Sequence, residues 1–197
     1  MTWLELVAVV FGAVSVYLSV RQNIWSWPTA LVNVTLYFLI FKRERLYADM
    51  GLQVFYAGIS LYGWYHWLFG GEGRTILKVT HTPRYLGVVL PVLGLSAAYG
   101  IGTILGNTTD ASVPYMDSTL TVTSLIAQWM MSRKYLENWI VWVVADVAYI
   151  GMFIYRGLYL TSFLYAVFLV LATKGYFEWR ASLRADQSTV QEPAHAI

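Results

Sequence analysis

The segment 138–146 places polar and aromatic side chains at a regular spacing inside an apolar run. Asn138, Trp142 and Asp146 follow one another at intervals of four residues, so on a helix they share one face. An indole attracts a cation over its ring, whereas a carboxylate at the centre of a bilayer costs about 2.5 to 3.5 kcal/mol. The face therefore indicates a site for a flat, cationic, hydrogen-bonding solute. The alternative is a buried aspartate that only ties two helices together.

Three further amides lie in the middle of apolar runs, at Gln128, Asn33 and Gln53. Gln128 precedes Arg133 by five residues and Asn138 follows it by five, so these two amides are predicted to meet at one depth. Each amide could equally bridge two helices or contact a ligand. The predicted substrate-binding residues are Asn138, Trp142, Asp146, Gln128, Asn33 and Gln53.

Other kinds of chemistry find little support in the chain. There is no cysteine, and His66 and His81 lack the spacing of metal ligands. No HExxH, GxSxG or phosphate-binding loop occurs. We therefore expect no catalytic residues, no metal and no cofactor, and a protein that is not an enzyme. The formal net charge of +2 is explained by membrane topology, so no nucleic-acid partner is expected.

The elements that must position these residues are membrane helices. The chain has 197 residues, of which 58% are hydrophobic and 12% charged, and a helical span needs about 20 mostly apolar residues. We predict an all-α polytopic membrane protein with seven transmembrane helices in the lipid bilayer. The hydrophobic runs lie at about 3–19, 24–41, 46–69, 85–105, 118–132, 138–155 and 158–180.

The distribution of Lys and Arg predicts the orientation, because cytoplasmic loops carry an excess of both. Four of the 13 basic residues fall on one side of the predicted bundle, at Lys42, Arg43, Arg45 and Arg156. Eight fall on the other side, which is therefore predicted to be cytoplasmic, with the N-terminus outside and the C-terminus inside. The eight are Arg21, Arg74, Lys78, Arg84, Arg133, Lys134, Arg180 and Arg184.

The sequence also resembles itself when residue n is aligned with residue n+112. This offset pairs Trp27 with Trp139 and Gly63 with Gly175, and internal duplication is common in transporters. We predict a 3+1+3 parallel repeat. Its parts are a three-helix unit at 1–69, a linker with the fourth helix at 70–117, a second three-helix unit at 118–182, and a disordered cytoplasmic tail at 183–197.

Three blocks carry a resemblance to a known family. They are "LYADMGLQ" at 46–53, "GWYHW" at 63–67 and "NWIVW" at 138–142. The chain resembles the Pnu vitamin transporter family over residues 5–180. The resemblance implies a fold like that of the sugar-transporting SWEET proteins, a homotrimer in the inner membrane, and facilitated diffusion followed by trapping of the solute through intracellular phosphorylation.

The resemblance also implies a substrate. Asn138 and Trp142 of the third block match residues that hold the ligand in the family, and nicotinamide riboside, a precursor in NAD biosynthesis, is the expected solute. Thiamine, another flat cation, is the main alternative, because an aromatic site does not separate the two. A membrane subunit without transport activity ranks lower, since it would not need a polar face on one helix.

Overall fold

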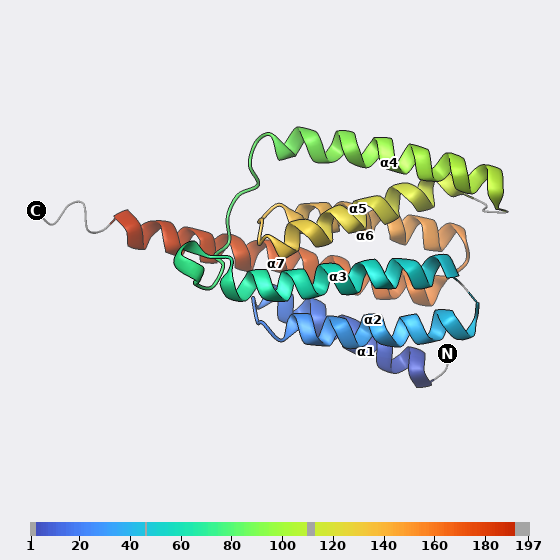
Figure 1. The fold of residues 1–197 in the computed structure, drawn as a ribbon, viewed down its shortest axis with the longest axis horizontal. Coiled ribbons are helices and arrows are strands. Elements are labelled where there is room, and N and C mark those ends of the chain that lie inside the picture. The colour runs from blue at the N-terminus through green and yellow to red at the C-terminus, as the bar shows by residue number, and fades with distance from the viewer. Residues whose placement is uncertain (1–2, 46, 110–112, 192–197) are drawn as a thin grey trace, which may run out of the picture.

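The computed structural model describes residues 3–45, 47–109 and 113–191. Within them the regular elements are seven long α-helices and one short 3-10 helix (Figure 1), so the prediction of an all-α protein with seven helices is confirmed. The elements are α1 (Trp3–Val20), α2 (Ser26–Arg43), α3 (Tyr47–Phe69), η1 (Glu72–Arg74), α4 (Leu86–Thr108), α5 (Pro114–Ser132), α6 (Asn138–Tyr155) and α7 (Tyr159–Gln191).

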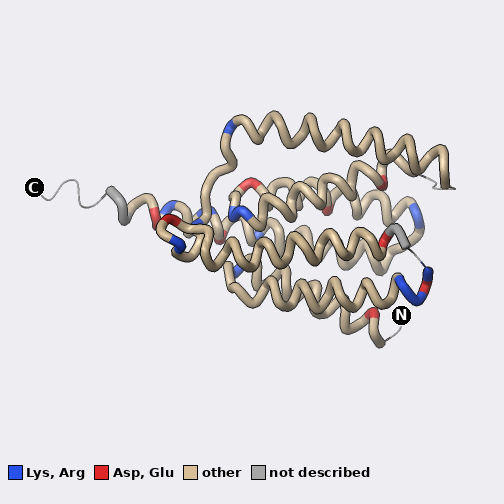
Figure 2. The backbone as a smooth tube through the Cα atoms, viewed as in Figure 1, with Lys and Arg blue, Asp and Glu red and all other residues tan. Residues whose placement is uncertain are grey.

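The helices lie side by side and consecutive helices run in alternating directions, so that the N- and C-termini lie at opposite ends (Figure 1). Four helices, α1, α4, α6 and α7, are long and apolar enough by composition to cross a membrane. The remaining three, α2, α3 and α5, are more polar and carry the amides Asn33, Gln53 and Gln128. Most charged residues gather at the two ends of the bundle (Figure 2), as expected of helices that cross an apolar layer.

Two groups of three helices, α1–α3 and α5–α7, share their local geometry at the offset that pairs Trp27 with Trp139. The rings of Trp27 and Trp67 meet edge to face with centroids 5.2 Å apart, and those of Trp139 and Trp179 do so at 5.3 Å. The turns that precede α2 and α6 also match, because Gln22 and Lys134 both have positive φ, at 53° and 52°.

Two glycines allow the tryptophans of these groups to pack closely on the next helix. A Cβ atom on Gly63 would come closer than 3.0 Å to the ring of Trp27, and a Cβ atom on Gly175 would do the same to the ring of Trp139. Each glycine of α3 or α7 therefore receives the indole of α2 or α6.

The linker between the two groups has ordered structure before α4. Residues 75–83 run along the turn that joins α5 to α6, where Thr80 N donates to Lys134 O at 3.1 Å and Leu136 N donates to Thr80 O at 2.9 Å. Helix α4 then lies on the outside of the bundle and packs along α5 (Figure 1).

The predicted C-terminal tail starts too early. Helix α7 continues to Gln191, well into the segment expected to be disordered from residue 183. Leu183 is buried in the hydrophobic cluster of the bundle, and Asp186 pairs with Lys78 at 3.1 Å, so both contacts stabilise this extension. Residues 192–197 lie outside the described residues.

Candidate binding site

A cavity of about 220 Å³ lies between the two groups of helices. We call it the aromatic cavity, because three indoles, those of Trp27, Trp139 and Trp142, form part of its wall. Both groups contribute to it, which means that one ligand could contact both. Its other lining residues are Ser15, Val16, Ser19, Ser26, Ala30, Gln128, Met131, Asp146, Tyr165, Phe168 and Ala172.

The carboxylate of Asp146 lies in the wall of the aromatic cavity. The residue is 2% exposed, and within the described residues its side chain makes no hydrogen bond or ion pair that would compensate its charge. Because a buried charge is costly unless it is paired, the position favours a cationic ligand close to the three indoles. The counterpart of Asp146 in the first group of helices is Val34, so the carboxylate belongs to one half only.

Several hydrogen-bonding groups in this wall also lack a partner within the described residues. They are the indole N–H groups of Trp27, Trp139 and Trp142 and the hydroxyl of Ser26. Buried polar groups in folded proteins are nearly always hydrogen-bonded. The cavity therefore offers donors to a ligand with acceptor oxygens, in addition to a carboxylate for a positive charge.

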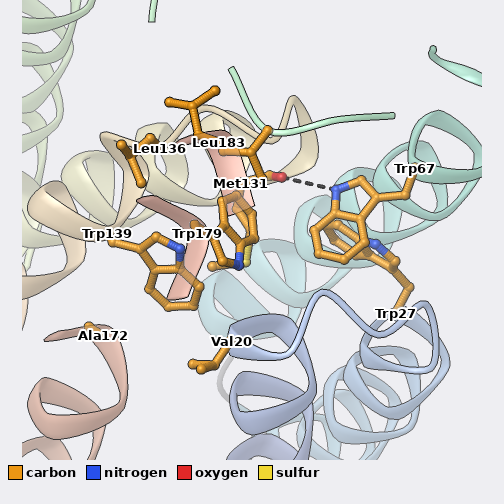
Figure 3. Packing of buried hydrophobic residues seen from close by; sticks show 10 residues of the cluster. Val20, Trp27, Trp67, Met131, Leu136, Trp139, Ala172, Trp179 and Leu183 are labelled. Atoms are coloured by element: carbon orange, nitrogen blue, oxygen red, sulfur yellow. Dashed lines mark hydrogen bonds between the residues drawn. The ribbon is translucent and has the colours of Figure 1, made fainter. Parts of the chain in front are cut away.

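Two other indoles close the end of this region, and both are fully engaged. Trp67 Nε1 donates to the carbonyl oxygen of Met131 at 3.1 Å, and Trp179 Nε1 donates to that of Ser19 at 3.0 Å. Figure 3 shows the first bond and the four neighbouring rings of Trp27, Trp67, Trp139 and Trp179. Each bond crosses from one group of helices to the other, so the tryptophans also hold the two groups together.

A second cavity of about 270 Å³ adjoins the first. We call it the amide cavity, because Asn33, Gln53 and Gln128 lie in its wall together with the hydroxyl-bearing side chains of Tyr37, Tyr56 and Ser60. Its remaining lining residues are Ser15, Ala30 and Val34. Ser15, Ala30 and Gln128 line both cavities, so the amide of Gln128 lies at their common boundary.

Five of the six predicted site residues line the cavities. Trp142 and Asp146 line the aromatic cavity, Asn33 and Gln53 line the amide cavity, and Gln128 lines both. Asn33 also bridges two helices, since its Nδ2 donates to the carbonyl of Ala8 at 2.7 Å.

Asn138 lines neither cavity. It is completely buried, and its Nδ2 donates to the carbonyl of Tyr135 at 2.6 Å. Its Oδ1 has no partner within the described residues. The predicted convergence of Gln128 and Asn138 in one wall is thus not observed.

The indoles of Trp27 and Trp139 are cavity residues that were not among the predicted site residues. Both indeed pack on glycines, and both also face the aromatic cavity. The repeated pairing of Trp27 with Trp139 was visible in the sequence, but the direction in which the two rings point was not. Tyr165, which lies on α7 and lines the same cavity, gave no sequence signal.

The turn between α5 and α6 carries the buried ammonium group of Lys134 and the partly buried carboxylate of Glu137 at one end of the bundle. Burial lowers the pKa of Lys134 to about 8, and its Nζ donates to the carbonyl of Leu77 at 2.9 Å and lies 4.5 Å from the ring centroid of Trp67. Burial would raise the pKa of Glu137, but hydrogen bonds from His81 and Thr82 lower it overall. These contacts fix the 75–83 segment onto the turn.

Comparison with known proteins identifies the family. A family model described as nicotinamide mononucleotide transporter matches residues 2–181. The chain belongs to this family. The resemblance to Pnu vitamin transporters noted in the sequence is therefore confirmed, and the chain is a multi-pass membrane protein of a transporter family rather than an enzyme.

Individual relatives cover nearly the whole chain. The nicotinamide riboside transporter PnuC of Escherichia coli (strain K12) is 28% identical over 209 aligned positions, which span 93% of this chain and 87% of the relative. The riboflavin/roseoflavin transporter RibM of Streptomyces davaonensis is 24% identical over 203 positions, which span 98% of this chain and 92% of the relative. A crystal structure of the vitamin B3 transporter PnuC has a TM-score of 0.72 at 22% identity, covering 93% of this chain and 83% of that one.

Proposed function

We propose that this protein carries nicotinamide riboside across the inner membrane by facilitated diffusion, with intracellular phosphorylation trapping the solute. The observation that carries the proposal is the aromatic cavity, in which the buried and unpaired carboxylate of Asp146 lies in one wall with the indoles of Trp27, Trp139 and Trp142. A pyridinium ring is flat and positively charged, so it suits stacking on an indole and attraction to a carboxylate.

The remaining polar groups suit the rest of this molecule. Its carboxamide oxygen could accept from the unpartnered indole N–H groups or from Ser26. Its ribose hydroxyls could bind Gln128, Asn33 and Gln53 along the amide cavity. Asn138 lines neither cavity, so we assign its amide a role in the turn before α6, through its bond to Tyr135, and no direct ligand contact.

We further propose that α1–α3 and α5–α7 form a 3+1+3 parallel repeat of the kind found in SWEET proteins. The matching tryptophan pairs and turns, at corresponding positions of the two groups, support it. In the membrane the N-terminus lies outside and the C-terminus inside, because the C-terminal end of the bundle carries the excess of Lys and Arg. We expect the transporter to be a homotrimer.

Thiamine and riboflavin are alternatives to nicotinamide riboside as the substrate. Thiamine is also a flat cation, and the relative RibM carries riboflavin or roseoflavin by its name. Riboflavin has no fixed positive charge, so it gains nothing from a carboxylate in the wall. Asp146 therefore favours a cationic vitamin over a flavin.

The decisive experiment is uptake of labelled nicotinamide riboside, thiamine and riboflavin by proteoliposomes, with direct binding measured in parallel. We expect nicotinamide riboside to bind and enter, and Asp146→Asn to weaken its binding about tenfold, the effect of roughly 1.4 kcal/mol of lost charge attraction. Asp117→Asn is the control, since that carboxylate pairs with Arg156 at the far end. Tighter binding of thiamine or riboflavin than of nicotinamide riboside would contradict the proposed substrate.

A further inference from the structure

A cleft lies on the outside of the bundle, away from the aromatic cavity and the amide cavity. It has a volume of about 530 Å³ and runs between α4 on one side and α5 and the start of α6 on the other. We propose that this cleft binds one acyl chain of an anionic phospholipid, with Arg84 pairing with the phosphate of its headgroup.

The shape of the cleft follows from two glycines on α4. At Gly94 the helices are in close contact, since an added Cβ would lie 2.8 Å from Ile126 Cδ1 on α5. At Gly87, nearly two turns earlier, an added Cβ would meet nothing within 4 Å. The cleft is therefore narrow at Gly94 and open toward Arg84.

The part of the cleft between Arg84 and Gly94 has about the depth of one leaflet of a bilayer. Gly94 lies ten residues after Arg84, which is about 15 Å at the rise of a helix, half of a hydrocarbon core of roughly 30 Å. An acyl chain that enters beside Arg84 would thus reach the narrow part of the cleft near the midplane of the membrane.

The wall of the cleft is apolar along this length. Leu90, Leu95 and Met130 line it, and so do Thr119 and Thr123. Each threonine donates its hydroxyl to a carbonyl of its own helix, at 2.7 Å in both cases. Their hydrogen-bonding needs are met inside α5, so the wall suits hydrocarbon.

The charges at the open end favour an anion. Two ionisable residues line the cleft, Arg84 and Glu137. The Glu137 carboxylate accepts bonds from His81 Nδ1, Thr82 N and Thr82 Oγ1, each 2.7 Å long. Arg84 is exposed and its guanidinium forms no ion pair within the described residues, and guanidinium binds phosphate through paired hydrogen bonds.

The surroundings of Arg84 place it at the depth of the headgroups. Tyr85 next to it is 66% exposed, and tyrosine is enriched at the interface between membrane and water. The α4 face beyond it exposes Val88, Val92 and Leu95. A lipid in the cleft would therefore continue the lipid layer that covers α4.

The test is native mass spectrometry of the purified protein with phosphatidylglycerol and with phosphatidylcholine of the same chains. Arg84→Gln should lower retention of phosphatidylglycerol about fivefold, the effect of one basic charge near the surface, and Arg84→Lys should lower it less. Arg74→Gln, which removes an exposed charge outside the cleft at the same end, is the matched control and should have no effect.

A cleft-filling variant tests the acyl chain separately. A Cβ atom at Gly87 meets nothing within 4 Å, so Gly87→Leu should fill the open part of the cleft and displace both lipids while the protein keeps its thermal stability. Equal losses in Arg84→Gln and Arg74→Gln, or unchanged lipid retention in Gly87→Leu, would overturn the proposal. So would a finding that Gly87→Leu disrupts the oligomer and leaves lipid retention intact, because a second copy of the chain would then cover the cleft.

Discussion

Trp67 and Trp179 hold corresponding places in the two groups of helices and pack against each other with their ring centroids 5.8 Å apart. Each donates its indole N–H to a backbone carbonyl of the opposite group, and the acceptors, Met131 and Ser19, are themselves counterparts under the same offset. The interface between the two groups therefore contains two equivalent hydrogen bonds, one donated from each group.

The first prediction concerns these two bonds. Trp67→Phe and Trp179→Phe each remove the donor of a buried hydrogen bond, while the carbonyls of Met131 and Ser19 keep their bonds from Lys134 N and Gln22 N. The free energy of unfolding should therefore fall by about 0.5 to 1.5 kcal/mol. Thermal unfolding in detergent measures the effect. Trp25→Phe, at a position 65% exposed, is the control. Equal melting temperatures in all three variants would show that the bonds contribute nothing.

The second prediction concerns the glycines beneath Trp27 and Trp139. Gly63→Ala and Gly175→Ala place a methyl group against a fixed indole, and overpacking of this kind costs about 1 to 3 kcal/mol. Gly58→Ala and Gly151→Ala are matched controls, since a Cβ at either position meets nothing within 4 Å. Both controls should be neutral or slightly stabilising, because alanine favours helix over glycine. Tolerance of alanine at 63 and 175 would argue against close packing there.

The third prediction concerns ligand affinity. Trp142→Ala should weaken binding of nicotinamide riboside by about 1 to 3 kcal/mol, through loss of the cation–π contact and of apolar burial. Trp139→Phe retains an aromatic ring on Gly175 but loses an unpartnered N–H in the same wall, so its effect on affinity should be smaller. Isothermal titration with protein of matched oligomer content distinguishes the two variants. A larger loss of affinity in Trp139→Phe than in Trp142→Ala would contradict the assignment of Trp142 as the main contact.

The fourth prediction is a pH dependence caused by Lys134. Its pKa is lowered from 10.5 to about 8, so between these values the unfolded chain binds a proton that the folded chain does not. The free energy of unfolding should therefore rise with pH across this window, by at most roughly 3 kcal/mol, while below pH 8 the full cost of burying the ammonium group is present.

Unfolding curves of the parent and of Lys134→Gln between pH 7.5 and 10, values chosen to bracket most of this window, measure this contribution. The variant should lose the rise. Lys78→Gln, which removes an exposed ammonium group paired with Asp186, should keep it. A parent protein whose stability falls steadily over this range relative to Lys134→Gln would contradict the sign.

The fifth prediction concerns the mode of transport. Among the six predicted site residues Asp146 is the sole carboxylate, and a proton relay normally needs several ionisable groups in series. Uptake of nicotinamide riboside into kinase-free proteoliposomes should therefore stop at equal concentrations inside and outside. Accumulation that a protonophore abolishes would instead make Asp146 a proton carrier.

Much of the fold could be predicted from the sequence because hydrophobic length and spacing act locally. Helix α6 was predicted at 138–155 and runs from Asn138 to Tyr155. Helix α7 was underestimated because the contacts that extend it, the burial of Leu183 and the Lys78–Asp186 pair, come from distant segments. The start of α5 at Pro114 instead of 118 reflects a proline in the first turn, which is suited to that position.

The site could be predicted only in part. The four-residue spacing placed Trp142 and Asp146 in one wall, since both lie on one helix. It did not separate Asn138 from them, although that amide lines neither cavity and donates to the carbonyl of Tyr135. Nor could it place Gln128 at the boundary of two cavities, which depends on how α5 packs against α3 and α6.

One contact bears on the ancestry of the chain. The ammonium group of Lys134 lies 3.4 Å from Oε1 of Gln22, and these two residues are counterparts, so under the proposed duplication this position meets its own copy. In a symmetric dimer of identical half-length chains, lysine here would face lysine and the buried charges would repel each other. A lysine at this place therefore favours a partner that differs from it. Gene fusion lets the two sides diverge, so under the proposed duplication we expect the lysine to have arisen after that event.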